Sequence, residues 1–220
     1  MNDTSTPATI LIIVATALIS IRGFNRPEFM ARFIFDAQLI QRQREYLRLI
    51  SSGFLHANWM HLIFNMLSLF FFGRYVEIVL GAPVYILLYL LSLIGGGLLS
   101  LILNRNTEYR ALGASGAVSG IIFACIFIFP GGSVYMFPLP FPIPSWLYAI
   151  LFVIISLYGM RSRAGNIGHD AHLGGALSGL LITAVLVPQA ILNNLLLFIV
   201  ILCLVVVSLI YIHKKFNPYV

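Results

Sequence analysis

Long apolar runs separated by short polar connections dominate the pattern of residues along this chain. Seven runs approach the roughly 20 residues that a helix needs to cross a bilayer core, although the first and fifth are marginal in length. The runs are residues 8–21, 54–72, 84–103, 112–129, 146–160, 171–187 and 191–212. None shows the alternation of a transmembrane barrel strand, and a backbone in lipid must satisfy its own hydrogen bonds. The pattern therefore predicts an all-α, polytopic membrane helix bundle.

Two of the connections differ from ordinary short loops. Residues 22–53 mix arginines with aromatic and aliphatic residues, which favours a segment lying in the membrane interface over a solvated loop with some helix. Residues 130–144 carry prolines at alternate positions from Pro138 to Pro144. Proline at this density forbids an ordinary helix, so we expect a turn or an extended strap there.

Composition and charge agree with lipid as the main solvent. The 220 residues are 60% hydrophobic and only 9% charged, whereas soluble domains carry about 25% charged residues. The formal net charge of +6 would suggest nucleic acid as the partner of a soluble protein. Here the basic residues flank apolar runs, as they do at a membrane surface. We therefore expect the lipid bilayer, and no nucleic acid, as a partner.

Polar residues at the starts of three apolar runs are the candidates for chemistry, because polar groups inside a membrane are costly. Successive spans alternate in direction, so the second, fourth and sixth runs all begin on the same side of the membrane. The candidates in these three starts are His56, Asn58, His61 and Asn65, then Gly113, Ser115 and Gly116, then His169, Asp170 and His172.

The residue types fit acyl transfer. A serine hydroxyl becomes a strong nucleophile only when a base takes its proton, which His172 can do for Ser115. Unpaired amides at a helix start, with the Asn65 amide and the His61 imidazole, can hold the oxyanion that forms on attack. Pairs of glycines four residues apart, at 116 and 120 and at 175 and 179, let helices approach closely enough for such contacts.

Other interpretations of these residues remain open. His56 and Asn58 can instead be water-boundary residues, and His169 and Asp170 can cap the sixth helix. Asp170 can instead orient His172, but residues two apart face different sides of a helix, which favours a dyad over a triad. A histidine metal site is disfavoured, because His56 and His61 are five apart and no carboxylate inside a span accompanies them. We therefore expect no metal.

The ordered motifs resemble those of rhomboid intramembrane serine proteases. The matching segments are His56–Asn65, Gly73–Glu77, Gly113–Gly116 and Ala171–Gly175. The resemblance implies a Ser115 nucleophile and a His172 base, with Asn65, His61 and the Ser115 amide stabilising the oxyanion. His56, Gly113 and Gly116 are accessory positions, and Glu77 resembles a structural residue.

The resemblance also implies an organisation and an activity. Residues 1–187 would form a rhomboid-like six-helix catalytic core with a first loop at 22–53, and 188–220 would add a seventh helix and tail. The fifth span and the loop 161–168 would resemble a lateral gate and cap. The implied activity is a serine endopeptidase that cleaves transmembrane segments of other proteins without a cofactor. The implied location is a bacterial inner membrane, with the oligomeric state and the physiological substrate left open.

Two questions stay open at this point. Of the 13 Lys and Arg residues, only Arg74 falls on the side opposite the motifs. The positive-inside rule therefore places the motifs in the cytoplasm, whereas the family resemblance, which we follow, implies the other side. The rival functions are a non-catalytic rhomboid-like adaptor that binds client helices and a small-molecule transporter, although the chain shows no internal repeat of the transporter kind.

Overall fold

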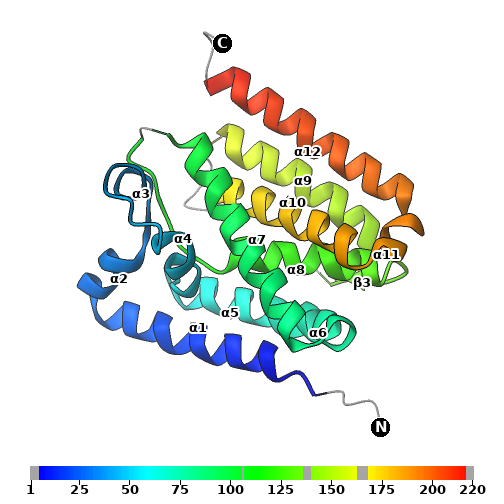
Figure 1. The fold of residues 1–220 in the computed structure, drawn as a ribbon, viewed down its shortest axis with the longest axis horizontal. Helices are drawn as coiled ribbons and strands as arrows, with labels where there is room; N and C mark the ends of the chain where they lie inside the picture. Colours follow the sequence, from blue (N-terminus) through cyan, green and yellow to red (C-terminus); the bar gives the residue numbers. More distant parts are fainter. Residues whose placement is uncertain (1–4, 106, 136–139, 163–167, 217–220) are drawn as a thin grey trace.

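The computed structural model of the chain, shown in Figure 1, describes residues 5–105, 107–135, 140–162 and 168–216. Most of these residues are helical, and this confirms the predicted all-α membrane bundle. The helices are α1 (Pro7–Asn25), α2 (Pro27–Phe33), α3 (Ala37–Gln43), α4 (Arg48–Ser51), η1 (Ser52–Phe54), α5 (Trp59–Ser68), η2 (Leu69–Gly73), α6 (Arg74–Leu80), α7 (Ala82–Leu103), α8 (Ser115–Ile128), α9 (Ser145–Ser162), α10 (His169–Leu186), α11 (Pro188–Leu192) and α12 (Leu195–Phe216). The strands are β1 (Phe35–Asp36), β2 (Arg110–Ala111), β3 (Ser133–Val134) and β4 (Ile143–Pro144).

Within the described residues, four helical segments are long and apolar enough to cross a membrane: Pro7–Asn25, Trp59–Leu80, Ala82–Leu103 and Leu195–Ile212. α8 and α9 are shorter apolar helices. The predicted bounds of the first two spans were wrong. α1 is longer than its marginal run, and the second span starts at Trp59 because the Asn58 side chain caps it, accepting the His61 N–H at 2.9 Å. That span continues to Leu80 through the π-helical turn η2.

α8 is the central helix of the bundle. Figure 1 shows α1 and α12 along opposite edges of the molecule, with α7, α8 and α10 between them. Every residue from Gly116 to Phe127 is buried, as expected of a helix that is apolar all round. The helix that begins at the candidate nucleophile is therefore surrounded by protein.

Glycines set the close packing of α8 against α10. The two predicted pairs face one another, since a Cβ on Gly175 would overlap the Gly116 backbone and a Cβ on Gly179 would overlap Gly120. Gly96 of α7 lies against α10 in the same way, where a Cβ would come within 2.6 Å of the Ala171 carbonyl oxygen. Small residues at these crossings bring the starts of α8 and α10 together.

The buried carboxylate of Glu77 in α6 holds the start of α1. It accepts hydrogen bonds from the Ala8 and Thr9 amides at 2.8 and 2.7 Å and from the Thr9 hydroxyl at 2.7 Å. The first amides of a helix lack intrahelical partners, and the helix dipole favours a negative charge beside them. Glu77 thus has a structural place at the end of the bundle where α1 begins.

The first loop folds on itself and onto the segment before α8. The buried guanidinium of Arg48 donates to the Ala31 and Ile34 carbonyls at 3.0 and 2.7 Å. β1 pairs antiparallel with β2, and the Arg110 guanidinium donates to Asp36 at 2.8 Å. Burial alone would raise the pKa of Asp36, but bonds from the Leu39 amide and from Arg110 lower it below its ordinary value. Asp36 is therefore ionised in this contact between the first loop and β2.

The connection between α8 and α9 contains a short antiparallel pair, in which Ser133 of β3 lies opposite Pro144 of β4. Extended backbone at these positions agrees with the predicted strap. Its remaining part around Pro138, and most of the predicted cap loop between α9 and α10, lie outside the described residues.

Candidate active site

Three helix starts meet at one end of the bundle. α5, α8 and α10 all begin at the end where α2, α3 and α4 lie (Figure 1). Ser115 is the first residue of α8, and His61 and His172 lie in the first turns of α5 and α10. The structure thus brings the predicted serine and histidines to one end, as the alternating direction of the spans required.

The turn before Ser115 is fixed by its neighbours. Gly113 has φ of +127°, a backbone conformation that side chains disfavour. Its amide donates to the Ser52 carbonyl of η1 at 3.0 Å. A Cβ on Gly113 would lie 2.8 Å from His61 Nε2 and 3.7 Å from the Ser115 hydroxyl oxygen. His61 and Ser115 therefore border one small space, which a side chain at 113 would fill.

The first amides of α8 are the candidate oxyanion donors. The Val118 amide already donates to the Ala114 carbonyl at 2.9 Å. The amides of Ser115, Gly116 and Ala117 have no intrahelical partner, as is general for a first turn. The Gly113 and Ala114 amides both have acceptors. Among the described residues, the next amide along the chain, that of Ser115, donates to no acceptor. An oxyanion on a substrate attacked by Ser115 would form beside it.

His172 lies beside the nucleophile turn without a hydrogen bond to it. A Cβ on Gly116 would lie 3.8 Å from the Ala171 Cβ, so the two turns that carry Ser115 and His172 pack together. The His172 ring lies 6.1 Å from the Phe152 ring and 5.8 Å from the His169 ring, measured between centroids. Among the described residues, neither the Ser115 hydroxyl nor the His172 imidazole makes a hydrogen bond. Contacts of this kind are often long in free enzymes and shorten when substrate binds.

The Asp170 carboxylate makes hydrogen bonds with residues other than His172. It accepts from Asn104 Nδ2 at 2.6 Å, from the Tyr109 hydroxyl at 2.9 Å and from the Ala171 amide at 2.9 Å. Burial, together with the charge of Asp170, raises the pKa of Tyr109, so this phenol keeps the proton that it donates. These contacts tie the start of α10 to the connection after α7. Gly168 is the N-cap of α10, and the Asp170 carboxylate accepts the Ala171 amide of the first turn, so Asp170 helps to satisfy the start of this helix although neither His169 nor Asp170 is the N-cap residue.

Asn65 and His61 share one face of α5. Asn65 is buried, and its Nδ2 donates to the His61 carbonyl at 2.9 Å, one turn earlier. One of its two amide protons is used there, which leaves the second for another acceptor. His61 is half-buried and reaches the space in front of Gly113.

His56 is fully buried, so a water-boundary position for it was wrong, whereas Asn58 is exposed and caps α5. The Nδ1 of His56 lies 2.9 Å from the Ser20 hydroxyl oxygen, and the Nε2 of His56 accepts a hydrogen bond from the Ala114 amide at 3.4 Å. Burial, with a smaller contribution from His61, lowers the pKa of His56 to about 3. His56 precedes the span that begins at Trp59 and lies behind the turn that carries Ser115.

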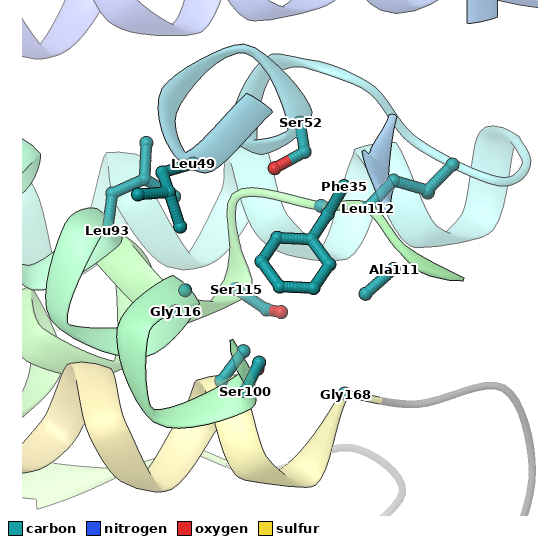
Figure 2. A pocket seen from close by; sticks show the side chains of 13 residues that line it. Phe35, Leu49, Ser52, Leu93, Ser100, Ala111, Leu112, Ser115, Gly116 and Gly168 are labelled. Carbon is teal, nitrogen blue, oxygen red and sulfur yellow. The ribbon is translucent and has the colours of Figure 1, made fainter. Parts of the chain in front are cut away.

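A cavity of about 30 Å³ adjoins Ser115. Figure 2 shows Ser115 among the residues that line it, beside the Phe35 ring, with Ser52 above and Ser100 below in this view. The buried Ser100 hydroxyl lines this cavity and interacts with the Tyr109 hydroxyl. A space of this size and polarity fits one or two water molecules. It is too small for a bulky side chain of a substrate.

The sequence did not single out Ser20, Asn104 or Tyr109, although all three contact candidate site residues. Buried polar groups need partners, so His56 and Asp170 signalled that such residues exist. Nothing in the spacing said which residues they are. No group of three or more His, Cys, Asp or Glu residues in the described ranges could hold a metal ion.

Helices that cross the membrane, with a serine and histidines gathered at one end, define a polytopic membrane protein with a serine–histidine candidate site. The family model described as Rhomboid domain matches residues 43–189. The chain therefore belongs to the rhomboid family.

Relatives with curated names agree with this assignment. The chain is 33% identical over 156 residues to Rhomboid protein 1, mitochondrial, of Saccharomyces cerevisiae, covering 68% of this chain and 45% of the relative. It is 28% identical over 192 residues to RHOMBOID-like protein 12, mitochondrial, of Arabidopsis thaliana, covering 80% and 56%. It is 29% identical over 170 residues to Rhomboid protease GluP of Bacillus subtilis, covering 76% and 32%. The chain thus spans about half or less of the length of these relatives.

Proposed function

We propose that this chain is an intramembrane serine endopeptidase that cleaves transmembrane segments of other membrane proteins with a Ser115–His172 dyad. The observation that carries the proposal is the meeting of Ser115, His172 and His61 at one end of three packed helices, beside an unpaired amide. A relative named as a protease, of Bacillus subtilis, supports the same activity.

The reaction follows from these groups. His172 takes the proton of the Ser115 hydroxyl as its oxygen attacks the scissile carbonyl. The resulting oxyanion accepts from the Ser115 amide, with Asn65 Nδ2 and His61 as side-chain donors. His172 then gives its proton to the leaving amine, and an acyl-enzyme forms. A water molecule, deprotonated by His172, hydrolyses the ester and restores Ser115.

No metal or organic cofactor takes part in these steps. The expected substrate is a transmembrane helix that unwinds readily, with small residues near the cut, because an α-helical peptide bond is hidden from a nucleophile until the helix opens. The bilayer is the second partner, and the oligomeric state is open.

The decisive comparison is wild type against Ser115→Ala and His172→Ala on a reporter transmembrane substrate in detergent. We expect each variant to lose at least about 10³-fold in cleavage rate, since the members of a dyad act as a unit. A fluorophosphonate probe should label wild type at Ser115 and leave Ser115→Ala unlabelled. Undiminished cleavage by either variant would refute the Ser115–His172 dyad. Absence of cleavage in wild type would favour a non-catalytic adaptor that binds client helices.

The chain is an integral membrane protein, and its particular membrane is a prediction. A bacterial inner membrane agrees with the relative of Bacillus subtilis. The two relatives named as mitochondrial give that location no support. Fractionation of the native cell, with detection of the intact chain, decides between the two.

A further inference from the structure

Two buried side chains that the proposed reaction does not use lie behind the nucleophile. Ser20 belongs to α1 and His56 to the segment before α5, and both are 0% exposed. The Ser20 hydroxyl lies 2.9 Å from the Phe54 carbonyl oxygen and 2.9 Å from His56 Nδ1. On its other side, His56 Nε2 lies 3.4 Å from the Ala114 amide nitrogen. The three residues form a continuous bridge from α1 to the turn before Ser115.

The Ala114 amide and the Phe54 carbonyl, at the two ends of the bridge, determine which atom carries each proton between them. An amide N–H can only donate, so His56 Nε2 must be the bare, accepting nitrogen. The neutral ring then carries its proton on Nδ1, which donates to the Ser20 oxygen. Ser20 has one proton, and the Phe54 carbonyl can only accept it. The bridge therefore has a single consistent arrangement, in which His56 is neutral and in the Nδ1–H form.

We propose that His56 is a positioning residue of the active site, held in its Nδ1–H form by Ser20 of α1 so that its Nε2 fixes the Ala114 amide. The proposal rests on the proposed proteolysis for its effect on rate. With the Gly113 amide held by Ser52 and the Ala114 amide held by His56, both amides before Ser115 are occupied. The Ser115 amide is then aimed, with its hydroxyl, at the reacting carbonyl.

The bridge depends on a neutral His56. A protonated ring would turn an N–H toward the Ala114 N–H and set two donors against each other. His61 lies nearest among the titratable groups, with its ring centroid 4.9 Å from that of His56. Burial and this neighbour both disfavour the charged form. Ser20 lies outside residues 43–189, so the part of the chain that matches the family model does not contain the whole bridge.

The kinetic test compares Ser20→Ala with Thr16→Ala. Thr16 lies one turn earlier on the same buried face of α1, and its hydroxyl interacts with the Tyr89 hydroxyl and is not part of the bridge. We expect Ser20→Ala to lower kcat by roughly fivefold, the effect of one lost hydrogen bond, with KM nearly unchanged. Fluorophosphonate labelling of Ser115 should slow in parallel. Thr16→Ala should leave both rates within about twofold of wild type, and equal losses in the two variants would overturn the proposal.

Two substitutions of His56 itself test whether its hydrogen bonds matter. Gln keeps a donor group and an acceptor group, whereas Phe keeps an aromatic ring but has no polar atom. We expect His56→Gln to retain several-fold more kcat than His56→Phe when both variants unfold at similar temperatures. Equal activity of these two variants counts against the hydrogen-bonded role.

A spectroscopic test is independent of cleavage. In histidine-¹⁵N-labelled protein at neutral pH, the His56 signals, assigned by their loss in His56→Gln, should show a protonated Nδ1 and a bare Nε2. An Nε2–H tautomer or an imidazolium in wild type refutes the bridge even if the protein cleaves its substrate. A wild type that cleaves nothing and still shows the Nδ1–H form refutes the proposed function alone.

Discussion

Gly113 shows at the scale of one residue why the motif before Ser115 needs a glycine. The sequence marked it as an accessory position from its place in the motif. The structure supplies two separate reasons, the positive φ and the contact that a Cβ would make with the His61 ring. The hydrogen bond from the Gly113 amide to the Ser52 carbonyl further fixes the turn. A side chain at this position would therefore displace His61 or the turn.

For Gly113→Ala we expect a loss of roughly 10²-fold in cleavage rate, because a shift of about 1 Å near the reacting atoms has an effect of that size. The measurement is steady-state cleavage of the reporter substrate, with thermal unfolding followed in the same detergent. Gly131→Ala is the matched control, since a Cβ there meets nothing within 4 Å. Wild-type activity in Gly113→Ala would show that the turn has room the structure does not indicate.

At the scale of the elements, α1 is attached to the core near both ends. Glu77 holds its first amides, and Ser20, about three turns later, contacts His56. The buried face of α1 carries Thr9, Thr16 and Ser20 among small and aliphatic residues. Polar contacts across helices have more effect on register than apolar packing alone, since each donor has few acceptors to choose from. We infer that these two attachments fix the position of α1.

Glu77→Gln should lower the free energy of unfolding by about 1.5–3 kcal/mol, the range for hydrogen bonds to a charged group. The amide that replaces one carboxylate oxygen would face the N–H donors of α1. Denaturant titration in mixed micelles measures the change. Glu28→Gln removes the same charge from an exposed site in α2 and should change little. A similar loss in both variants would point to net charge as the cause.

Most of the elements could be predicted from the sequence, and the errors have physical reasons. Apolar runs mark spans, but they do not mark caps, so the Asn58 cap moved the start of the second span to Trp59. The run also ended too early at 72, because Arg74 and Glu77 look like loop residues until a neighbouring helix satisfies the carboxylate. Two-residue strands leave no periodic signal at all. The meeting of Ser115, His172 and His61 at one end of the bundle was predictable because motif spacing and span direction agree, and their catalytic roles, with that of Asn65, stay a prediction.

At the scale of the whole molecule, charge and the candidate catalytic residues gather at the same end. The arginines of the first loop, Arg105 and Arg110 all lie on connections at the end where α5, α8 and α10 begin, whereas Arg74 is in α6. Some of these charges are engaged within the protein, as Arg48 is with backbone carbonyls and Arg110 with Asp36. Such residues are held by the fold, which weakens them as signals for orientation. This is a physical reason to follow the family resemblance over the positive-inside rule.

The predicted seven-span topology would place Tyr46 and Tyr135 in opposite compartments. Both side chains are exposed, at 58% and 77%, with Tyr46 in the first loop and Tyr135 in the connection after α8. In a background without Cys125 and Cys203, we expect an impermeant maleimide on sealed cells or mitoplasts to label Tyr46→Cys, and Tyr135→Cys only after permeabilisation. A reporter fused after Val220 should fall on the Tyr46 side, because the seventh span returns the chain to it. The reverse labelling pattern would place the active site in the inner compartment, as the charge bias indicates. Labelling of both cysteines from one side would contradict the seven-span topology itself.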